Sequence, residues 1–306
     1  MQGIGSQPLA AMSTGDEVLV VHLGGLGDVC LSESVFLSLR GHFGDRLVGL
    51  GNRRFFDLFG GYFLRTHGVE SRHWLYLFSE KLTGPRWGRI AFIGKDRRGS
   101  IRSRWKAHSV EEPLFIDMYP EGAFGSPSPG DGTAAAGETV HVEDYQLRQL
   151  SAVGIEPARK EIVPKEARRV ILYAEQGFSK EKWPVENFVV LREVLEEAGI
   201  DVRLMRPPEL SLSTRGSIFF EDLADVKDFF GIGGVFVSND SGMAHLAGVC
   251  GLTTMTIFTA FDPAVWHPRG RNISLRTGVD RTDVESLAGM IIGIMERWDG
   301  KGEGLS

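Results

Sequence analysis

Short apolar runs alternate with amphipathic segments along most of the chain. The first run, residues 17–23, is rich in β-branched residues and predicts a buried strand. A glycine loop follows it, and residues 29–39 then show the apolar spacing of a helix. The first half continues with a strand at 47–50, a short helix at 53–59, and strands at 89–93 and 114–118. This order is typical of a parallel sheet covered by helices.

The alternation restarts in the second half after a stretch without periodicity. Residues 121–138 are rich in Pro, Gly, Ser and Ala and predict a mobile loop. An amphipathic helix is expected at 142–153 and an inter-domain linker at 154–168. Strands are then predicted at 169–173, 201–205, 235–238 and 253–258, and helices at 185–198, 223–230, 243–249 and 284–298.

A chain of 306 residues is long enough for two domains. We expect a flexible lead-in at 1–16, an N-terminal domain at 17–160 and a C-terminal domain at 161–306. The fold class is α/β, with two Rossmann-like domains in tandem. Sheets of this kind bind ligands beyond the carboxyl ends of their strands, so a cleft is expected between the loops of the two domains.

Composition narrows the classes of function. The formal charge of −6 gives no overall basic footprint for nucleic acid, although it leaves room for a local basic patch. Cys30 and Cys250 are isolated, which predicts neither a disulfide framework nor a zinc site and favours the cytoplasm. The first 16 residues lack the pattern of a signal peptide, and apolar runs of membrane-spanning length are absent from the sequence. We expect a soluble protein, or one that touches a membrane surface.

The segment 235–258 predicts a strand, a polar turn, a helix and a second strand. Asp240, Ser241 and Gly242 stand where the helix begins, and His245 follows one turn later. Unpaired N–H groups and the helix dipole make such an end suitable for a diphosphate. The alternative is that Ser241 only caps the helix and His245 packs in the core, and the residues themselves leave both open.

The first glycine loop is ambiguous by itself. Gly25 and Gly27 resemble the opening of a dinucleotide fingerprint, but Cys30 occupies the position of its third glycine. Asn52 stands where an acid for the ribose is wanted, so a nicotinamide oxidoreductase is disfavoured. The loop also brings the carboxylate of Asp28 to the first turn of a helix. The Asp28 carboxylate either belongs to a binding or catalytic site or simply complements the helix dipole.

Two further segments contain candidate ligands. Lys180 and Lys182 precede Pro184 at the start of a helix, where they either meet a phosphate or belong to a solvated turn. Residues 258–270 form a loop after a strand that is expected to shape a nucleotide or sugar pocket, and we assign its His267 no catalytic role. The sequence has no Asp-x-Asp pair to hold a metal on a diphosphate.

Four ordered motifs together resemble the ADP-heptose:lipopolysaccharide heptosyltransferase family, glycosyltransferase family 9. They are Leu-Gly-Gly-Leu-Gly-Asp at 23–28, Trp-Pro at 183–184, Asn-Asp-Ser-Gly-Met-Ala-His-Leu at 239–246, and Asp-Pro…Trp…Pro-x-Gly at 262–270. The resemblance implies the GT-B fold, with the sugar nucleotide held mainly by the second domain and the acceptor by the first.

The resemblance also implies a role for each first-domain residue. Asp28 is the general base that removes the proton of an acceptor hydroxyl, and Gly24, Gly25 and Gly27 form the loop beside the acceptor. Because Asp28 sits at a helix N-terminus, we expect its pKa to be lowered, with burial on domain closure as a possible compensation.

In the second domain, the resemblance implies that Asp240 holds sugar hydroxyls. Ser241, Gly242 and His245 stabilise the departing diphosphate in place of a metal ion, and a lysine, Lys180 or Lys182, meets the phosphate. The chain departs from the family pattern at three places: His22 replaces an arginine or lysine, Glu181 replaces a lysine, and Thr-Ala-Phe at 259–261 replaces Gly-Pro-Thr.

The resemblance predicts an inverting, metal-independent transferase without a cofactor. It moves heptose or a related sugar, with ADP-heptose as the favoured donor, to a lipopolysaccharide core or another glycan. The expected partners are the donor and a lipid-linked or free glycan, without nucleic acid. The expected place is the cytoplasm, including the cytoplasmic face of the inner membrane. The alternative is a noncatalytic protein of the same fold that binds sugar nucleotides or glycans.

Overall fold

The computed structural model describes residues 15–123, 139–175, 182–208, 210, 216–277, 280 and 282–300. Lys180, Glu181 and most of the predicted loop at 121–138 lie outside these residues. The chain divides into two compact units. Unit 1 combines Met1–Pro120 with Val142–Lys160, and unit 2 combines Glu121–His141 with Glu161–Ser306. The chain therefore enters unit 2 briefly before it returns to unit 1 and then leaves it.

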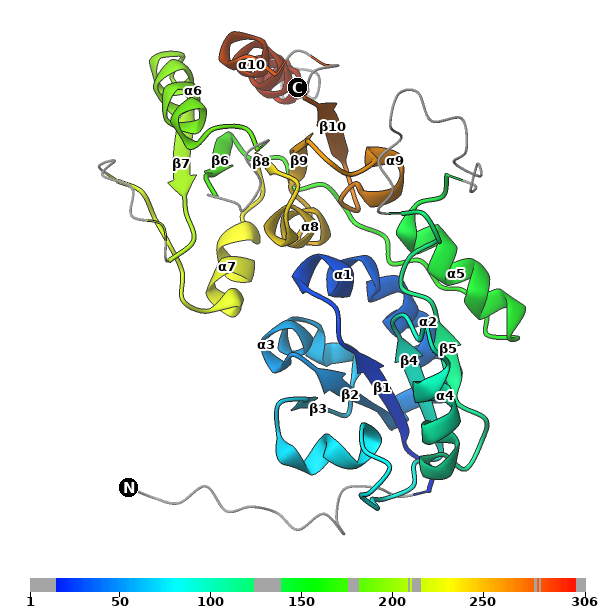
Figure 1. Cartoon of the computed structure of the whole chain (residues 1–306). Helices are drawn as coiled ribbons and strands as arrows, with labels where there is room; N and C mark the ends of the chain where they lie inside the picture. Colours follow the sequence, from blue (N-terminus) through cyan, green and yellow to red (C-terminus); the bar gives the residue numbers. More distant parts are fainter. Residues whose placement is uncertain are drawn as a thin grey trace, which may run out of the picture. The chain divides into compact units, whose positions relative to one another are not determined.

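Unit 1 is built on a parallel five-stranded sheet in the order β3-β2-β1-β4-β5 (Figure 1). Its strands are β1 (Val18–His22), β2 (Leu47–Gly51), β3 (Arg65–Gly68), β4 (Arg89–Ile93) and β5 (Leu114–Ile116). Every residue of β1 is buried, because this strand is central and helices cover both faces of such a sheet. That burial explains the unbroken apolar run from which the strand was predicted.

The helices of unit 1 connect these strands. They are α1 (Leu26–Leu31), α2 (Glu33–Phe43), α3 (Arg53–Phe56), α4 (Ser100–Trp105) and α5 (Val142–Ala152), with 3-10 turns η2 (Gly44–Arg46), η3 (Asp57–Tyr62), η4 (Arg72–Leu77) and η5 (Lys106–His108). The single helix predicted at 29–39 is in fact two, which meet at Ser32. The buried hydroxyl of Ser32 lies 3.2 Å from Nε2 of His22, so this break ties the helices to the end of β1.

An aromatic cluster fills one side of unit 1. Trp74, Tyr76, Trp87 and Trp105 are all at least 96% buried. Trp87 donates its indole N–H to the Tyr76 hydroxyl at 2.9 Å, and Trp105 donates to the carbonyl of Leu77 at 2.6 Å. The polar atoms of the large rings are thus satisfied, and η4 and α4 are held against the same core.

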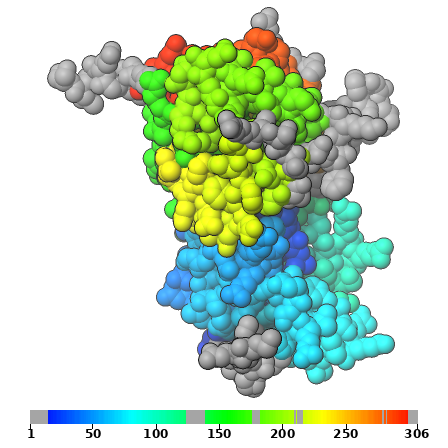
Figure 2. Space-filling model, turned by 90° about the vertical axis from the view of Figure 1, so that its left-hand side faces the viewer, coloured from blue at the N-terminus to red at the C-terminus, as the bar shows by residue number. Residues whose placement is uncertain are grey.

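Unit 2 repeats the architecture with the order β10-β9-β8-β6-β7, again all parallel. Its strands are β6 (Arg169–Tyr173), β7 (Asp201–Met205), β8 (Val235–Asn239), β9 (Thr253–Phe258) and β10 (Asn272–Arg276). Its helices are α6 (Val185–Glu197), α7 (Leu223–Phe230), α8 (Gly242–Val249), α9 (Pro263–Trp266) and α10 (Val284–Gly300). On one side of unit 2, the segments around α6 (green) and α7 (yellow) form the surface (Figure 2).

The strand order of each sheet marks where a ligand binds. In unit 1 the order reverses between β1 and β4, and in unit 2 it reverses between β6 and β8. Open parallel sheets bind ligands at the carboxyl ends of the strands that flank such a reversal. The residues that follow β1 and β8 are those of the glycine loop and of the Asp240 turn. Both predicted motifs therefore lie at the binding edge of their own unit.

The α/β fold class with two Rossmann-like units is confirmed. Among the residues that the structure describes, no helix has both the length and the apolar character needed to cross a membrane.

Candidate active site

The turn between β8 and α8 is the centre of the site in unit 2. Ser241 is the N-cap of α8, and its Oγ accepts a hydrogen bond from the Ala244 N–H at 3.3 Å. The predicted capping role of Ser241 is therefore present. It leaves the Ser241 hydroxyl hydrogen able to donate, and Gly242 is half-buried at the first position of the helix. A positive helix end with a hydroxyl donor suits an anion.

His245 lies under this turn and is 94% buried. Burial, together with the smaller effects of the nearby His141 and His267, lowers the pKa of His245 to about 3, so the ring is neutral at physiological pH. Its Nδ1 is buried and has no hydrogen-bond partner among the described residues. Its Nε2 is 3.9 Å from Oδ1 of Asp240. Because a buried polar atom without a partner is costly, the unpaired Nδ1 points to a ligand that completes it.

Two further histidines stand near His245. The His141 and His267 rings stack with centroids 4.0 Å apart, and Nε2 of His141 is 2.9 Å from the carbonyl oxygen of His267. Nδ1 of His267 is 3.0 Å from the carbonyl oxygen of Pro268. His141 was not predicted as a site residue, because nothing in the residues around it indicates that the chain brings it to the loop after α9.

Asp240 is the second titratable group of the turn. Burial raises its pKa to about 7; the charge of Lys182 opposes this shift, and that of Glu175 adds to it. Lys182 forms an ion pair with Glu175, and both side chains are about one-fifth exposed. Glu175 follows β6, the neighbour of β8 at the strand reversal, and was not predicted as a site residue. The structure thus places Lys182 where its charge acts on Asp240, but Lys182 is ion-paired with Glu175.

Asn239 anchors the segment that contains Lys182. Its Oδ1 accepts from the Trp183 N–H at 2.9 Å, and its Nδ2 donates to the Trp183 carbonyl at 3.2 Å. Trp183 is itself buried and donates its indole N–H to the Thr282 carbonyl at 2.7 Å. Two backbone groups and one ring therefore fix the position of Lys182 beside the β8 turn. Asn239 was identified only as part of a motif, and its positioning role emerges from these contacts.

The loop at 258–270 packs against α8. Asp262 caps α9, and Trp266 donates its indole N–H to the carbonyl of Ala123 at 2.9 Å. A Cβ on Gly248 would lie 2.4 Å from the carbonyl oxygen of Arg269, so only glycine allows this close approach of α8 to the loop.

The glycine loop of unit 1 presents Asp28 at the start of α1. Gly25 is the N-cap, Gly27 is the second residue of the helix, and Asp28 Oδ2 accepts the Gly25 N–H at 2.8 Å. The expected lowering of the Asp28 pKa is wrong: burial raises it, and the hydrogen bond from Gly25 only partly opposes the shift. Desolvation therefore outweighs the helix end, and the carboxylate is a stronger base than its position in the helix suggested.

Gly24 separates Asp28 from His22. A Cβ on Gly24 would come within 2.7 Å of both the Asp28 Cβ and the His22 ring. The backbone N–H of Gly24 donates to Nδ1 of His22 at 3.1 Å. Burial lowers the pKa of His22 to about 4. A neutral, internally bonded imidazole therefore stands where the family pattern has a cation, and it braces the loop instead of facing a ligand.

Each unit thus gathers its own predicted residues. Gly24, Gly25, Gly27 and Asp28 form one loop in unit 1, whereas Lys182, Asp240, Ser241, Gly242 and His245 gather around one turn in unit 2. Lys180 lies outside the described residues. Within the part of the chain that the structure describes, no group of three or more His, Cys, Asp or Glu side chains is arranged to hold a metal ion.

Solved structures of known proteins share the fold of this chain. The chain is similar to the E. coli heptosyltransferase WaaC with ADP, at 15% identity and a TM-score of 0.65 over 90% of this chain and 99% of that one. It is equally similar to a glycosyltransferase family 9 protein from Veillonella parvula DSM 2008, at 14% identity and a TM-score of 0.65 over 92% and 97%. E. coli ADP-heptose lipopolysaccharide heptosyltransferase II has 11% identity and a TM-score of 0.59 over 92% and 99%.

These structures share the two-sheet fold, which is that of a GT-B glycosyltransferase. Residues 139–282 match the family model described as glycosyltransferase family 9 (heptosyltransferase). That range contains β8, α8 and every predicted donor-side residue. No curated protein matches the chain significantly. The family-model match covers just under half of the chain, and together with the shared fold it indicates a glycosyltransferase.

Proposed function

We propose that this enzyme transfers a heptose or a related sugar from a nucleoside diphosphate donor, with ADP-heptose favoured, to a hydroxyl of a glycan. The donor binds unit 2 and the acceptor binds unit 1. The observation that carries the proposal is the buried, unpaired Nδ1 of His245 beside the N-terminus of α8. The names of the E. coli relatives, which include ADP and ADP-heptose, support the choice of donor.

The diphosphate takes the α8 end. The Ser241 hydroxyl and the helix N-terminus donate to its oxygens, and a neutral His245 presents Nδ1–H to the same group. These donors stabilise the negative charge that grows on the leaving group in the transition state. Asp240 accepts hydrogen bonds from sugar hydroxyls. The charges of Lys182 and Glu175 act in opposite directions on the pKa of Asp240 and so determine how far its carboxyl is ionised.

The transfer is a single displacement at the anomeric carbon. The acceptor hydroxyl gives its proton to the Asp28 carboxylate while its oxygen forms the new bond to that carbon. The bond from the carbon to the diphosphate oxygen breaks, and its electron pair leaves with the diphosphate. Attack opposite the leaving group inverts the configuration. The raised pKa of Asp28 favours its use as the base, and we propose that the reaction needs no resident metal.

We also propose that the reaction takes place in the cytoplasm on a lipid-linked glycan, such as a lipopolysaccharide core at the inner membrane. Because Lys182 is paired with Glu175, the donor phosphate either displaces Glu175 from the lysine or binds beside the intact pair. Both arrangements retain the helix end as the principal diphosphate site.

A thermal-shift series of ADP-, GDP-, UDP- and CDP-sugars tests the donor. A ligand at one hundred times its dissociation constant stabilises the folded state by about 2.7 kcal/mol, so the correct donor raises Tm. We expect ADP-heptose to do so and His245→Ala to abolish the effect, with His73→Ala in unit 1 as the control. NMR of the product shows whether the anomeric configuration is inverted. If no sugar nucleotide raises Tm, or a bound donor is never transferred to any acceptor glycan, the proposal fails.

A further inference from the structure

Positive charge is concentrated in one segment of unit 1. Residues 71–108 hold ten Lys and Arg but only two Asp and Glu, a formal charge of +8. The whole chain has a charge of −6, so the rest of the chain carries −14. The segment is therefore a strongly basic part of an otherwise acidic protein, and it contains none of the residues assigned to catalysis or donor binding.

Much of this charge is on the surface and uncompensated. Glu80, one of the two acids of the segment, pairs with Arg104 at 3.5 Å. The other, Asp96, accepts the backbone N–H groups of Ile101 and Arg102 at the start of α4. Five exposed cations form no ion pair with any residue that the structure describes: Arg72, Lys81, Arg97, Arg98 and Arg102.

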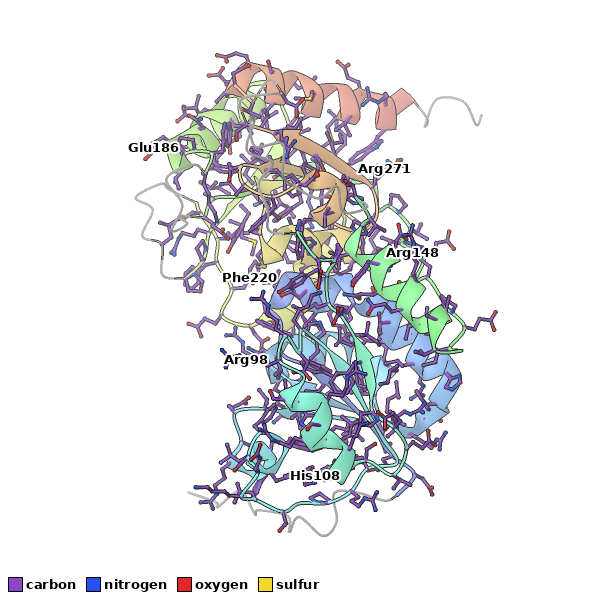
Figure 3. The ribbon with its side chains drawn as sticks, turned by 45° about the vertical axis from the view of Figure 1, so that its right-hand side comes forward. Arg98, His108, Arg148, Glu186, Phe220 and Arg271 are labelled. Atoms are coloured by element: carbon purple, nitrogen blue, oxygen red, sulfur yellow. The ribbon has the colours of Figure 1, made fainter. Side chains whose placement is uncertain are left out.

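The two ends of the segment adjoin. The indole N–H of Trp105 in α4 donates to the carbonyl of Leu77 in η4, and the rings of Trp105 and Phe78 are 6.0 Å apart. Figure 3 labels Arg98 and His108, which precede and follow α4. Residues around 70–85, cyan in Figure 2, are at the surface of unit 1. We call the exposed side chains of residues 72–82 and 97–106 the basic face.

The composition of the basic face distinguishes between anionic partners. Single-stranded nucleic acid is held by exposed aromatic rings on which bases stack. The three tryptophans of the segment, Trp74, Trp87 and Trp105, are instead at least 97% buried. Two leucines are exposed among the cations: Leu75 is 52% and Leu82 is 46% accessible. Exposed cations with interspersed apolar side chains are suited to the headgroup region of an anionic bilayer.

We propose that the basic face docks unit 1 on a membrane surface that contains anionic phospholipids. The loop with Arg97 and Arg98 follows β4, and β4 pairs with β1 so that Ile93 lies opposite His22. The basic face thus reaches the sheet edge at which Asp28 lies. Lipid binding itself does not require the proposed function; only its purpose, bringing a lipid-linked acceptor to Asp28, rests on that function.

Vesicle co-sedimentation of the full chain tests the proposal. The wild-type protein is expected to bind vesicles of phosphatidylglycerol and phosphatidylcholine, to bind pure phosphatidylcholine weakly, and to lose binding when salt shortens the Debye length. Each cation near an anionic surface contributes about the same favourable binding energy. Removing two of them in Arg97→Gln/Arg98→Gln should therefore weaken partitioning into the vesicles about thirtyfold. Arg203→Gln/Arg297→Gln makes the same charge change at exposed sites of unit 2 and should have little effect. Leu75→Ser/Leu82→Ser should also weaken binding.

Equal binding to both vesicle types, or equal losses in the two arginine pairs, would overturn the inference. Binding of a single-stranded oligonucleotide in preference to anionic vesicles would overturn it too. The ADP-heptose thermal shift, measured on the same variants, reports the donor site separately. An intact donor shift with no lipid binding therefore refutes the basic face alone, whereas lipid binding without a donor shift refutes the proposed donor alone.

Discussion

The ionisation of Asp240 makes the stability of unit 2 depend on pH in a direction opposite to that of an ordinary surface aspartate. Its pKa is about 7 in the folded chain and 3.8 as a free side chain, so the folded state binds the proton more tightly. Asp240 therefore contributes stability that is fully present below pH 3.8 and is lost progressively as pH rises from there through about 7. Asp240→Asn removes this titration.

The magnitude follows from the two pKa values. A pKa difference of about 3 corresponds to about 4 kcal/mol, and the 18% exposure of the side chain reduces the expected effect to about 2 to 4 kcal/mol. We therefore expect the free energy of unfolding of wild type, minus that of Asp240→Asn, to fall by that amount between pH 4 and pH 8. The neutral, buried His22 and His245 titrate in both proteins, so their opposite pH dependence largely cancels in the difference.

Urea unfolding at each pH measures this difference, and hydrogen exchange of peptides from β8 and α8 serves as the probe that reports unit 2. Asp225→Asn on α7 is the matched control, because its carboxylate is exposed in the same unit. A difference between wild type and Asp240→Asn that stays constant from pH 4 to pH 8, or rises, would refute the assignment of Asp240 as a desolvated carboxyl.

Two further substitutions test the neighbours of the principal residues. Glu175→Gln removes the partner of Lys182, so titration calorimetry should show ADP-heptose binding about tenfold tighter; unchanged or weaker binding would mean that the ion pair itself positions the lysine. Gly24→Ala places a Cβ 2.7 Å from the Asp28 side chain and should lower kcat about a hundredfold by moving the base, whereas donor affinity is retained. Near-normal kcat in a folded Gly24→Ala protein would show that the position of Asp28 is not critical.

The central strands were predictable from the sequence because burial on both faces leaves a continuous apolar run. β1 and β6, with every residue buried, are examples. The edge strands β3 and β10 were missed for the converse reason. β3 reads Arg-Thr-His-Gly and is half-buried throughout, and β10 has only two apolar residues in five. Their strand conformation depends on pairing with β2 and β9 rather than on their own residues.

The grouping of the candidate site residues was predictable where one local motif contains them. Asp240, Ser241, Gly242 and His245 lie within six residues, and the helix start fixes their relation. Glu175 was not predictable in this way, because it meets Lys182 and influences Asp240 only through the crossover that pairs β6 with β8. The direction of the Asp28 pKa shift could not be predicted without the fold, because it depends on how far the effect of burial exceeds that of the helix end.

The measurement that tests the central claim most directly is single-turnover transfer by Asp28→Asn from bound ADP-heptose to a glycan acceptor. Loss of a positioned general base costs typically 10²- to 10⁴-fold, so we expect the rate to fall by about that factor while the donor thermal shift stays at the wild-type value. The wild-type rate should rise with pH as Asp28 loses its proton, and the Asp28→Asn substitution should remove that dependence. Transfer by the variant at the wild-type rate, with the same pH profile, would contradict the assignment of Asp28 as the base.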